Sequence, residues 1–276
     1  MSSPAADATF GRMTVDSGVY GPWAVIAGGS EGVGASFATQ LAAAGINLVL
    51  IARKPGPLEQ TADQARTHGV EVRTVAADLL DRATFAAIRA ASDDVEVGLF
   101  VFNAGANTYG AQIVDGELDG FQRVIDLNIR AQLQLAQHFG ARLKARGRGG
   151  IILLGSLAGY LGQPQIGVYS AVKAFDRIFA ESLWIELEPH GVHVLELVLG
   201  ITRTPAMERA GLRMDIPGLN VAEPDDVARE GLEHLTDGPV WIAGGNFDTA
   251  RKRNGFPRDE IVRRAAEATR RLVPTD

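Results

Sequence analysis

The sequence predicts a single doubly wound α/β domain, in which a mostly parallel sheet of about seven strands carries helices on both faces. Three observations predict it. Short apolar runs alternate with longer segments of helical periodicity along most of the chain. A glycine-rich turn follows the first run, and the second run is apolar throughout, as in strands buried on both faces. The length of 276 residues fits one domain of this class.

The first predicted strand, residues 23–27, leads into a glycine turn and then into a helical pattern that reaches residue 45. Gly28, Gly32 and Gly34 are spaced Gly-x-x-x-Gly-x-Gly. Small residues there let the backbone approach a pyrophosphate, whose charge the helix N-terminus favours. Close packing of the strand and the helix explains such a turn equally well.

The second strand, residues 46–53, ends at a position that selects between two nucleotides. An acidic residue there binds the ribose 2'-hydroxyl of NAD and repels the 2'-phosphate of NADP. Here the basic Arg53 follows Ala52, and its guanidinium can fork onto a phosphate, to which Ser30 can also donate. The sequence therefore favours NADP(H) over NAD(H). Glu31 argues against this prediction, and a solvated basic turn is the alternative reading of Arg53.

The remaining strands are predicted at residues 70–76, 97–102, 150–154, 192–199 and 240–243. Helices are predicted at residues 58–68, 117–146, 169–189 and 224–235. Ligands of open parallel sheets bind beyond the carboxyl ends of the strands. Five strand ends therefore converge on one crevice, and the residues at or just after them are Gly28, Arg53, Asp78, Asn103 and Ser156.

Tyr169 and Lys173 are four residues apart and lie on the same face of a predicted helix. A free tyrosine loses its proton near pH ~10, and a neighbouring cation favours the phenolate, so such a pair can move a proton closer to neutral pH. Ser156, at the mouth of a strand, can hydrogen-bond the same substrate oxygen. A Tyr-x-x-x-Lys pair by itself is more often found on the surface, so the other motifs decide its meaning.

Asn128 lies on the apolar stripe of the predicted helix 117–146. A polar amide that faces a core is costly unless it is hydrogen-bonded. Asn128 is therefore either a satisfied core amide that bends the helix or the holder of a water that links Lys173 to solvent.

Together these motifs resemble the short-chain dehydrogenase/reductase family over roughly residues 22–245, although Ala27 stands where threonine is usual and Leu199 where proline is usual. The resemblance implies an oxidoreductase of the EC 1.1.1 type that transfers a hydride between NADP(H) and a carbonyl or secondary alcohol. It is most similar to the 3-oxoacyl reductase and hydroxysteroid dehydrogenase groups.

The resemblance also implies residue roles. Tyr169 gives the proton, Ser156 orients the substrate oxygen and Lys173 holds the nicotinamide ribose. Asn128 keeps the water relay, and Asp78 approaches the adenine, although a helix N-cap explains Asp78 nearly as well. The implied cofactor contacts are Gly28, Ser30, Gly32, Val33, Gly34, Arg53, Asp78, Leu79, Asn103, Ala104, Gly105, Tyr169, Lys173, Ile201 and Thr204.

We expect a tail over residues 1–21, a catalytic domain over 22–250 with a substrate lid at about 205–221, and a helical extension over 251–276. The apolar residues of the lid favour an apolar substrate, although an ordinary amphipathic helix would look the same. A homodimer or homotetramer is implied by the family's use of the two helices that carry Asn128 and Tyr169.

Composition narrows the function further. The net charge of -6 argues against nucleic acid or an anionic membrane as a partner. The chain has no cysteine, which excludes disulfides and thiolate chemistry, and its histidines show no metal-ligand spacing, so we expect no metal. It has neither a signal-like start nor about 18 consecutive apolar residues, so we expect a cytoplasmic protein with a small-molecule substrate.

Two other functions stay open. A protein of the same fold can bind NADP as a silent regulator or redox sensor, and the extended family includes sugar-nucleotide epimerases and dehydratases. The second class needs a larger C-terminal substrate domain, and only roughly 30 residues follow the last predicted strand. The identity of the substrate, the direction of the reaction and its stereochemistry stay open.

Overall fold

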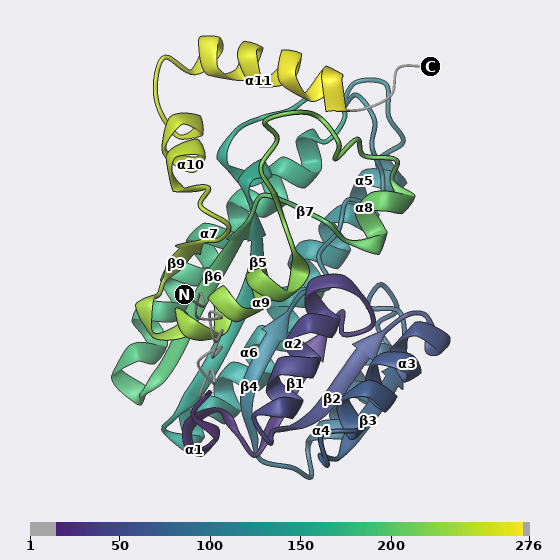
Figure 1. Ribbon diagram of the computed structural model, residues 1–276, viewed down its shortest axis with the longest axis vertical. Helices are drawn as coiled ribbons and strands as arrows, with labels where there is room; N and C mark the ends of the chain where they lie inside the picture. The colour runs from purple at the N-terminus through teal and green to yellow at the C-terminus, as the bar shows by residue number, and fades with distance from the viewer. Residues whose placement is uncertain (1–14, 273–276) are drawn as a thin grey trace, which may run out of the picture.

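The computed structural model describes residues 15–272, and a seven-stranded sheet of order β3-β2-β1-β4-β5-β6-β9 forms its centre (Figure 1). Every neighbouring pair of these strands is parallel. The strands are β1 (Trp23–Ala27), β2 (Asn47–Ala52), β3 (Val72–Ala76), β4 (Val97–Phe102), β5 (Gly149–Ser156), β6 (Val192–Leu199) and β9 (Val240–Ile242). The strand order reverses between β1 and β4, which confirms the predicted doubly wound fold class.

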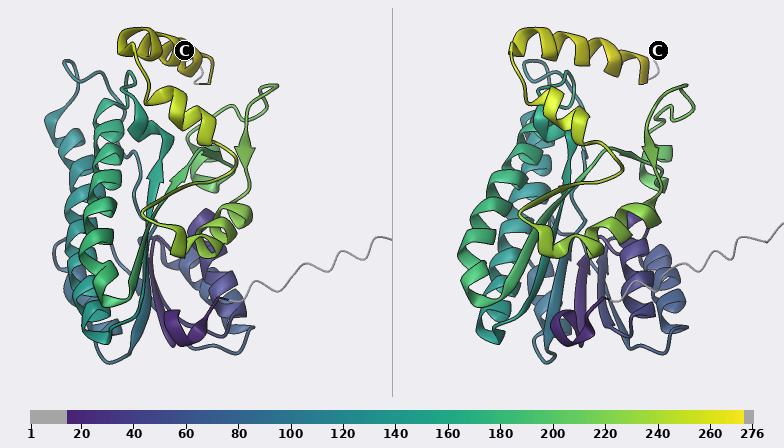
Figure 2. Two further views of the ribbon diagram at one scale, coloured as in Figure 1. Left: turned by 90° about the vertical axis from the view of Figure 1, so that its left-hand side faces the viewer. Right: turned by 60° about the vertical axis from the view of Figure 1, so that its left-hand side comes forward.

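Helices cover both faces of the sheet, which Figure 2 shows edge on. One face is covered by α2 (Gly32–Ala43), α3 (Pro55–Arg66) and α9 (Pro224–Glu233). The other face is covered by α4 (Thr84–Ser92), α6 (Ala131–Arg146) and α7 (Gly167–Leu187). The parallel strands are thereby buried on both sides, which explains their continuous apolar sequences.

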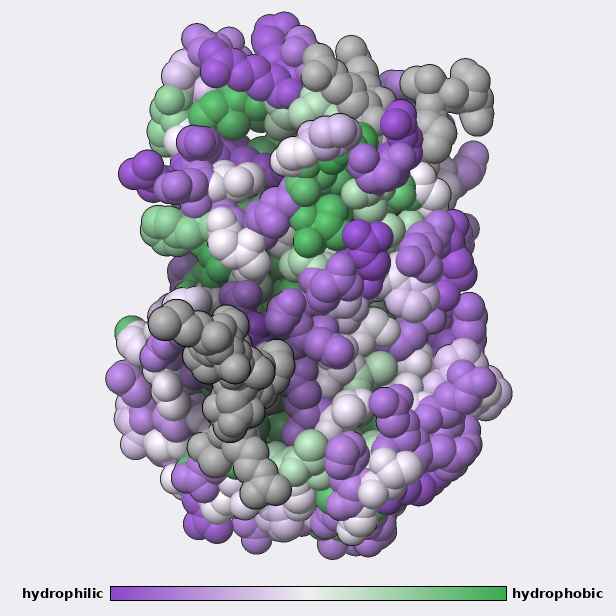
Figure 3. Space-filling model, viewed as in Figure 1, coloured by the Kyte–Doolittle hydropathy of each residue, from purple (hydrophilic) through white to green (hydrophobic). Residues whose placement is uncertain are grey.

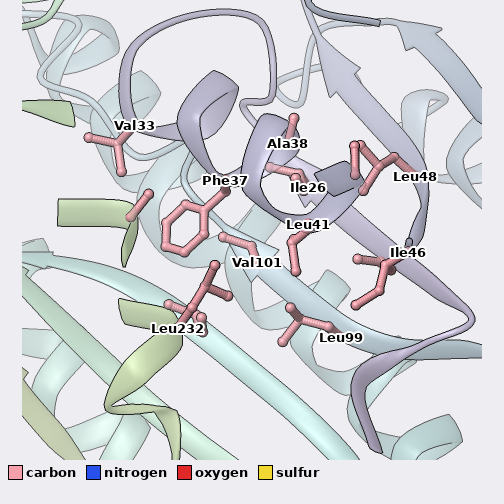
Figure 4. Packing of buried hydrophobic residues seen from close by; sticks show 14 of the residues in the cluster. Ile26, Val33, Phe37, Ala38, Leu41, Ile46, Leu48, Leu99, Val101 and Leu232 are labelled. Atoms are coloured by element: carbon pink, nitrogen blue, oxygen red, sulfur yellow. The ribbon is translucent and has the colours of Figure 1, made fainter. Parts of the chain in front are cut away.

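Strand β1 shows how this burial works. All five of its residues are buried. Ile26 faces α2, where Phe37 and Leu41 pack against it together with Leu232 of α9 (Figure 4). Val25, its neighbour in the chain, points into the core under α6 and α7. A strand at the centre of this sheet therefore has no polar face, and its carboxyl end is held rigidly.

The helix predicted over residues 117–146 is confirmed within one residue at its start, but it is not α-helical throughout. The chain there forms α5 (Leu118–Ile125), a π-helical turn η1 (Asp126–Arg130) and α6. Asn128 lies in the π-helical turn, and its Nδ2 donates to the carbonyl oxygens of Val124 (2.8 Å) and Ala106 (3.0 Å). The wide turn lets the side chain reach both oxygens, and such turns are frequent at functional sites.

At the N-terminus, the predicted tail lies outside the described residues as far as residue 14. Within 15–21, where we expected an irregular lead-in, Ser17–Tyr20 form the short helix α1, capped by the side chain of Asp16. The buried Tyr20 explains this order, because its hydroxyl bonds Nδ1 of His193 at 2.8 Å. Helix α1 is therefore anchored to β6.

The segment after β6 carries the short parallel pair β7 (Ile201–Thr202) and β8 (Val221–Ala222), with helix α8 (Pro205–Arg209) between them. The C-terminal extension consists of α10 (Phe247–Arg253) and α11 (Arg258–Leu272). Helix α11 lies across the end of the molecule where the strands finish (Figures 1 and 2). Within residues 15–272, no helix has both the length and the apolar character needed to cross a membrane.

Candidate active site

The predicted site residues lie at the carboxyl ends of the parallel strands. The glycine turn follows β1, Arg53 follows β2, Asp78 comes two residues after β3, and Asn103 follows β4. Ser156 is the last residue of β5, and the short strand that contains Ile201 begins two residues after β6. Parallel strands end at the same edge of a sheet, so the fold brings these residues together along one side of the domain.

The glycine turn is packed so closely that two of its positions exclude a side chain. A Cβ at Gly28 would lie 2.8 Å from the backbone nitrogen of Ala104, and φ of Gly28 is +87°. A Cβ at Gly34 would lie 2.0 Å from the carbonyl oxygen of Gly28. The Nδ2 atom of Asn103 donates to that same oxygen at 2.8 Å. The turn and the Asn-Ala-Gly segment therefore support each other, and close packing requires glycine at positions 28 and 34.

Gly105 makes room for two polar side chains. A Cβ there would lie 2.7 Å from Lys173 Nζ and 2.7 Å from Asn128 Oδ1. Both atoms therefore lie on the same side of the Gly105 backbone, at a spacing that one bridging water can span. Asn128 is fully buried, and its Oδ1 has no hydrogen-bond partner among the described residues.

Lys173 is 3% exposed and is held by two hydrogen bonds. Its Nζ donates to the carbonyl oxygen of Leu154 at 2.7 Å and to Oδ2 of Asp176 at 2.9 Å. Burial acts to lower the pKa of Lys173, but the neighbouring carboxylate of Asp176, through its charge and its hydrogen bond, outweighs burial and raises that pKa above its ordinary value. The lysine is therefore an ammonium ion at neutral pH.

Tyr169 and Ser156 complete the reactive group. Tyr169 is half-buried in the first turn of α7, and Lys173 Nζ lies 5.8 Å from the centre of its ring. The hydroxyl oxygen of Ser156 accepts from the backbone nitrogen of Ala158 at 3.1 Å, which leaves the hydroxyl proton available to donate to a substrate oxygen. The arrangement contains a potential proton donor in Tyr169, a hydrogen-bond donor in Ser156 and a cation in Lys173.

The end of β2 carries an exposed Arg53, and no hydrogen bond or ion pair within residues 15–272 engages its side chain. Glu31, the residue that argued against NADP, forms a bidentate ion pair with Arg209 of α8, with a 3.0 Å bond from Arg209 Nη1 to Oε2. The acidic charge in the glycine turn is therefore balanced by a guanidinium from a segment 178 residues further along the chain.

Four of the expected cofactor contacts have local partners. One oxygen of Asp78 accepts from the backbone nitrogen of Leu80 at 3.0 Å, whereas Val33 and Leu79 pack into the cores. Thr204 caps α8 through a 3.3 Å bond from the Met207 backbone nitrogen, and its methyl group lies 3.0 Å from where a Cβ of Gly32 would be. The start of the lid segment therefore lies directly on the glycine turn.

Three buried polar residues behind Lys173 were missed in the sequence. Asp176 accepts from Lys173 and, at Oδ1, from Gln132 Nε2 at 3.0 Å. Glu196 is fully buried in β6, and burial followed by the charge of Asp176 raises its pKa to about 8. Two signals were present: Asp176 follows Lys173 at helical spacing, and Glu196 is the one acid in an apolar strand, residues 192–199. For Gln132 the sequence carries no comparable signal.

The C-terminal extension reaches the turn after Ser156. Arg253 Nη1 donates to the carbonyl oxygen of Leu157 at 3.0 Å, and Arg258 Nη2 donates to that of Tyr160 at 3.2 Å. These carbonyls belong to η2 (Leu157–Tyr160), the short helix that Ser156 caps. The last part of the chain therefore borders the site.

Comparison with known proteins identifies the family that the motifs resemble. A family model described as short chain dehydrogenase matches residues 22–214. A 7beta-hydroxysteroid dehydrogenase from Collinsella aerofaciens is 32% identical over 234 residues, which are 82% of this chain and 87% of that protein. A very-long-chain 3-oxoacyl-CoA reductase from Podospora anserina is 34% identical over 200 residues, 70% of this chain and 58% of that protein.

Solved structures are similar as well. A 7beta-hydroxysteroid dehydrogenase has a TM-score of 0.81 at 28% identity and covers 90% of this chain and 98% of its own. A short-chain dehydrogenase from Sphingobium yanoikuyae in complex with NADPH has a TM-score of 0.73 at 30% identity, and the match covers 92% of this chain and 97% of that one. With the family model matching most of the chain, the protein belongs to the short-chain dehydrogenase/reductase family and is a hydride-transferring oxidoreductase.

Proposed function

We propose that the protein is an NADP(H)-dependent reductase that converts an apolar ketone to a secondary alcohol. The observation that carries the proposal is the group of Ser156, Tyr169 and charged Lys173 near the carboxyl ends of the strands, on the same side of the sheet as the closely packed glycine turn. The backbone packing at Gly28 and Gly34 and the unpartnered Asn128 Oδ1 fit a bound dinucleotide with water beside it.

When NADPH is bound, it supplies the hydride for the carbonyl carbon. Tyr169 gives its proton to the carbonyl oxygen, and Ser156 holds that oxygen by donating a hydrogen bond. Lys173 favours the resulting phenolate by its charge and holds the nicotinamide ribose. Asn128 and Lys173, both against Gly105, keep a water between them through which the tyrosine regains its proton. The cation and hydroxyl are already in place before the reaction, so little reorganisation is needed.

The preference for NADP(H) rests on the charges around the end of β2. Arg53 is exposed and unengaged within the described part of the chain, and no acid occupies the position at which NAD is selected. The pairing of Glu31 with Arg209 removes the main argument against a 2'-phosphate, because the carboxylate is already neutralised. The reductive direction follows from the reduced state of cellular NADP pools and not from the site.

An apolar substrate fits the surface around the site. Ile113 and Val114 are 62% and 89% exposed in the loop before α5. A Cβ at Gly167 would lie 2.9 Å from Ile113 Cδ1, so this side chain lies next to the turn of α7 that carries Tyr169. Figure 3 shows apolar surface gathered in the half of the molecule that holds the lid segment and α11. A steroid or a long acyl chain has the matching character.

A homodimer or homotetramer through α6 and α7 remains a prediction. Ile178 and Ile185, seven residues apart on α7, are 56% and 65% exposed, and Leu133 on α6 is 49% exposed. Burial of this surface between copies would remove apolar area from water. Light scattering of the parent and of Ile178→Glu tests it, and a parent that is monomeric at micromolar concentration contradicts it.

The activity test measures consumption of NADPH and NADH with a panel of ketones, from short 3-oxoacyl thioesters to oxosteroids. We expect turnover with NADPH, and a kcat that is ~100-fold or more lower in Tyr169→Phe because the proton donor is gone. Binding of NADPH to that variant should persist. Tight NADPH binding without turnover of any ketone would overturn the reductase and favour a silent regulator.

The cofactor test replaces Arg53. In Arg53→Ala, NADPH binding should weaken by about 10-fold or more and NADH binding should change little, because the lost contact is to the 2'-phosphate alone. Lys144→Ala is the matched control, since Lys144 is an exposed cation near the end of α6, away from the strand ends. Equal losses for both cofactors would refute this role of Arg53.

A further inference from the structure

A buried polar cluster lies behind the catalytic lysine, on the side away from Tyr169. It joins α7 to α6: Asp176 receives Lys173 at one carboxyl oxygen and Gln132 at the other. Asp176 and Gln132 are fully buried. A buried ionic group is costly unless it is paired and hydrogen-bonded. We therefore asked what these buried charges do for the neighbouring reactive residue.

The hydrogen-bond pattern indicates the charge of Asp176. Its Oδ2 lies 2.9 Å from an ammonium nitrogen, and its Oδ1 lies 3.0 Å from an amide nitrogen. Both neighbours are donors, whereas a protonated carboxyl needs an acceptor for its own hydrogen. Burial raises the pKa of Asp176 above its ordinary value, but the charge of Lys173 and the two hydrogen-bond donors oppose burial, so we take Asp176 as a carboxylate in an ionic pair with Lys173.

The bonds of Lys173 are also informative. An ammonium has three hydrogens, and Leu154 and Asp176 accept two of them. The third remains for the strand-end side of the lysine, where the nicotinamide ribose and the water beside Asn128 would share it. A lysine side chain has four rotatable bonds, so two fixed acceptors define where that third hydrogen can point.

The other charged and titratable groups around the cluster come from three elements. Helix α7 contributes Tyr169, Arg177 and Glu181, the turn η2 contributes Tyr160, and β6 contributes Glu196. Both carboxyl oxygens of Glu196 lack a hydrogen-bond partner among the described residues, and a Cβ at Gly155 would lie 2.0 Å from Oε1. No donor supports a negative charge on Glu196, and burial raises its pKa to about 8, so Asp176, which has two donors, is the anion that balances Lys173.

We propose that Asp176 is a positioning residue for the reaction: clamped by Gln132, its carboxylate keeps Lys173 an ammonium ion and aims the remaining N–H of that ion at the ligand site. The kinetic part of this inference rests on the function proposed above. The charge state of Lys173 does not, and it can be measured without substrate.

The first test uses lysine labelled with ¹³C at Cε, in the full-length protein. The chain has four lysines, and Lys54, Lys144 and Lys252 are exposed. In a pH titration by NMR, we expect the Lys173 signal, assigned by its loss in Lys173→Met, to report a pKa above the ordinary lysine value of 10.5. In Asp176→Asn it should titrate before the three exposed lysines, because burial then acts without an opposing anion.

This test stands even if Asp176→Asn does not fold, because the parent alone can decide it. A Lys173 signal in the parent that titrates below the three exposed lysines would overturn the proposal. In a folded Asp176→Asn, an unchanged Lys173 titration would overturn it as well.

The second test follows the pH dependence of alcohol oxidation, in which Tyr169 must lose its proton. Without the charge of Lys173 the phenolate is disfavoured, so the profile of kcat in Asp176→Asn should move to higher pH, with kcat at pH 7 about 10-fold lower and KM for the alcohol little changed. If Lys173 stayed charged, removal of the anion would move the profile to lower pH. A shift in that direction, or none, contradicts the proposed role.

Gln132→Leu provides a milder comparison, because it removes one hydrogen bond from Asp176 and leaves the ion pair. A purely structural role predicts equal losses of thermal stability and of kcat from both substitutions at every pH. The positioning role predicts that Asp176→Asn alone changes the lysine titration.

Discussion

The region behind Lys173 and the region around the lid hold their charges in opposite ways. The side chains of Lys173 and Asp176 are 2% and 0% exposed, and each has a second hydrogen-bond partner. The side chains of Arg209 and Glu31, which join the lid segment to the glycine turn, are 51% and 31% exposed. Both contacts are ion pairs, but water screens only the second.

This difference separates two tasks of the enzyme. Proton transfer needs a cation of fixed charge and position, and a dry interior between two packed helices provides both. The lid predicted at residues 205–221 would have to open and close, and a short element such as α8 with an exposed ion pair can do so at little cost. Substitutions on the two sides should therefore differ in size and in kind.

The largest effect is expected from Lys173→Met. It leaves Asp176 as a buried, unpaired carboxylate, and removal of one partner of a buried ion pair destabilises proteins by about 3 to 5 kcal/mol. Unfolding in urea at neutral pH measures the change. The double variant Lys173→Met/Asp176→Leu should recover most of the loss, since an apolar pair of similar volume carries no charge. A Lys173→Met variant as stable as the parent would show that Asp176 is screened by water as well as Glu31 is.

A smaller effect is expected from pH acting on Glu196. Its pKa in the folded protein is about 8, above the ordinary value of 4.5, so between these values the folded state holds a proton that the unfolded state has released. The stability from this group is fully present below about pH 4.5 and is lost as pH rises through 8. From pH 6 to pH 8 the parent should lose about 2 kcal/mol of unfolding free energy relative to Glu196→Gln.

Urea unfolding of both proteins between pH 6 and pH 8 measures how the free energy of unfolding changes with pH. A constant cost of burying the amide in Glu196→Gln shifts the whole curve and does not affect this slope. Parallel curves for the parent and Glu196→Gln would mean that Glu196 is ionised throughout and would remove the contrast with Asp176.

The smallest effect on stability is expected from Arg209→Ala. Its partner Glu31 remains in water, so the urea midpoint should not change beyond the scatter of the measurement. NADPH binding should weaken, because the freed carboxylate then faces the 2'-phosphate. Isothermal titration with NADPH and NADH separates an effect at the 2'-phosphate from a general loss of cofactor binding. A loss of stability as large as that of Lys173→Met would show that the exposed ion pair is not weaker than the buried one.

Local patterns in the sequence were sufficient to predict the fold class and to nominate Ser156, Tyr169 and Lys173 as the reactive group. The apolar run of β1, the glycine spacing after it and the four-residue step from Tyr169 to Lys173 are local patterns, and the strand ends lie within two residues of where the apolar runs stop. Patterns of this kind depend on backbone periodicity and on turn chemistry, which act over a few residues. The π-helical turn at Asn128 was not predicted, because a polar residue on an apolar stripe does not reveal which carbonyls it will reach.

Only the tertiary structure decided which distant residues meet. Asp176 and Gln132 are 44 positions apart, and Arg209 and Glu31 are 178 apart. Whether Glu196 faces Lys173 or the opposite side depends on the register of β6 against β5 and on the helix that covers them. The amino-acid sequence therefore determined the chemistry that this protein carries, and packing between elements determined the charge state in which that chemistry is held, since burial and neighbouring charges are properties of the folded chain alone.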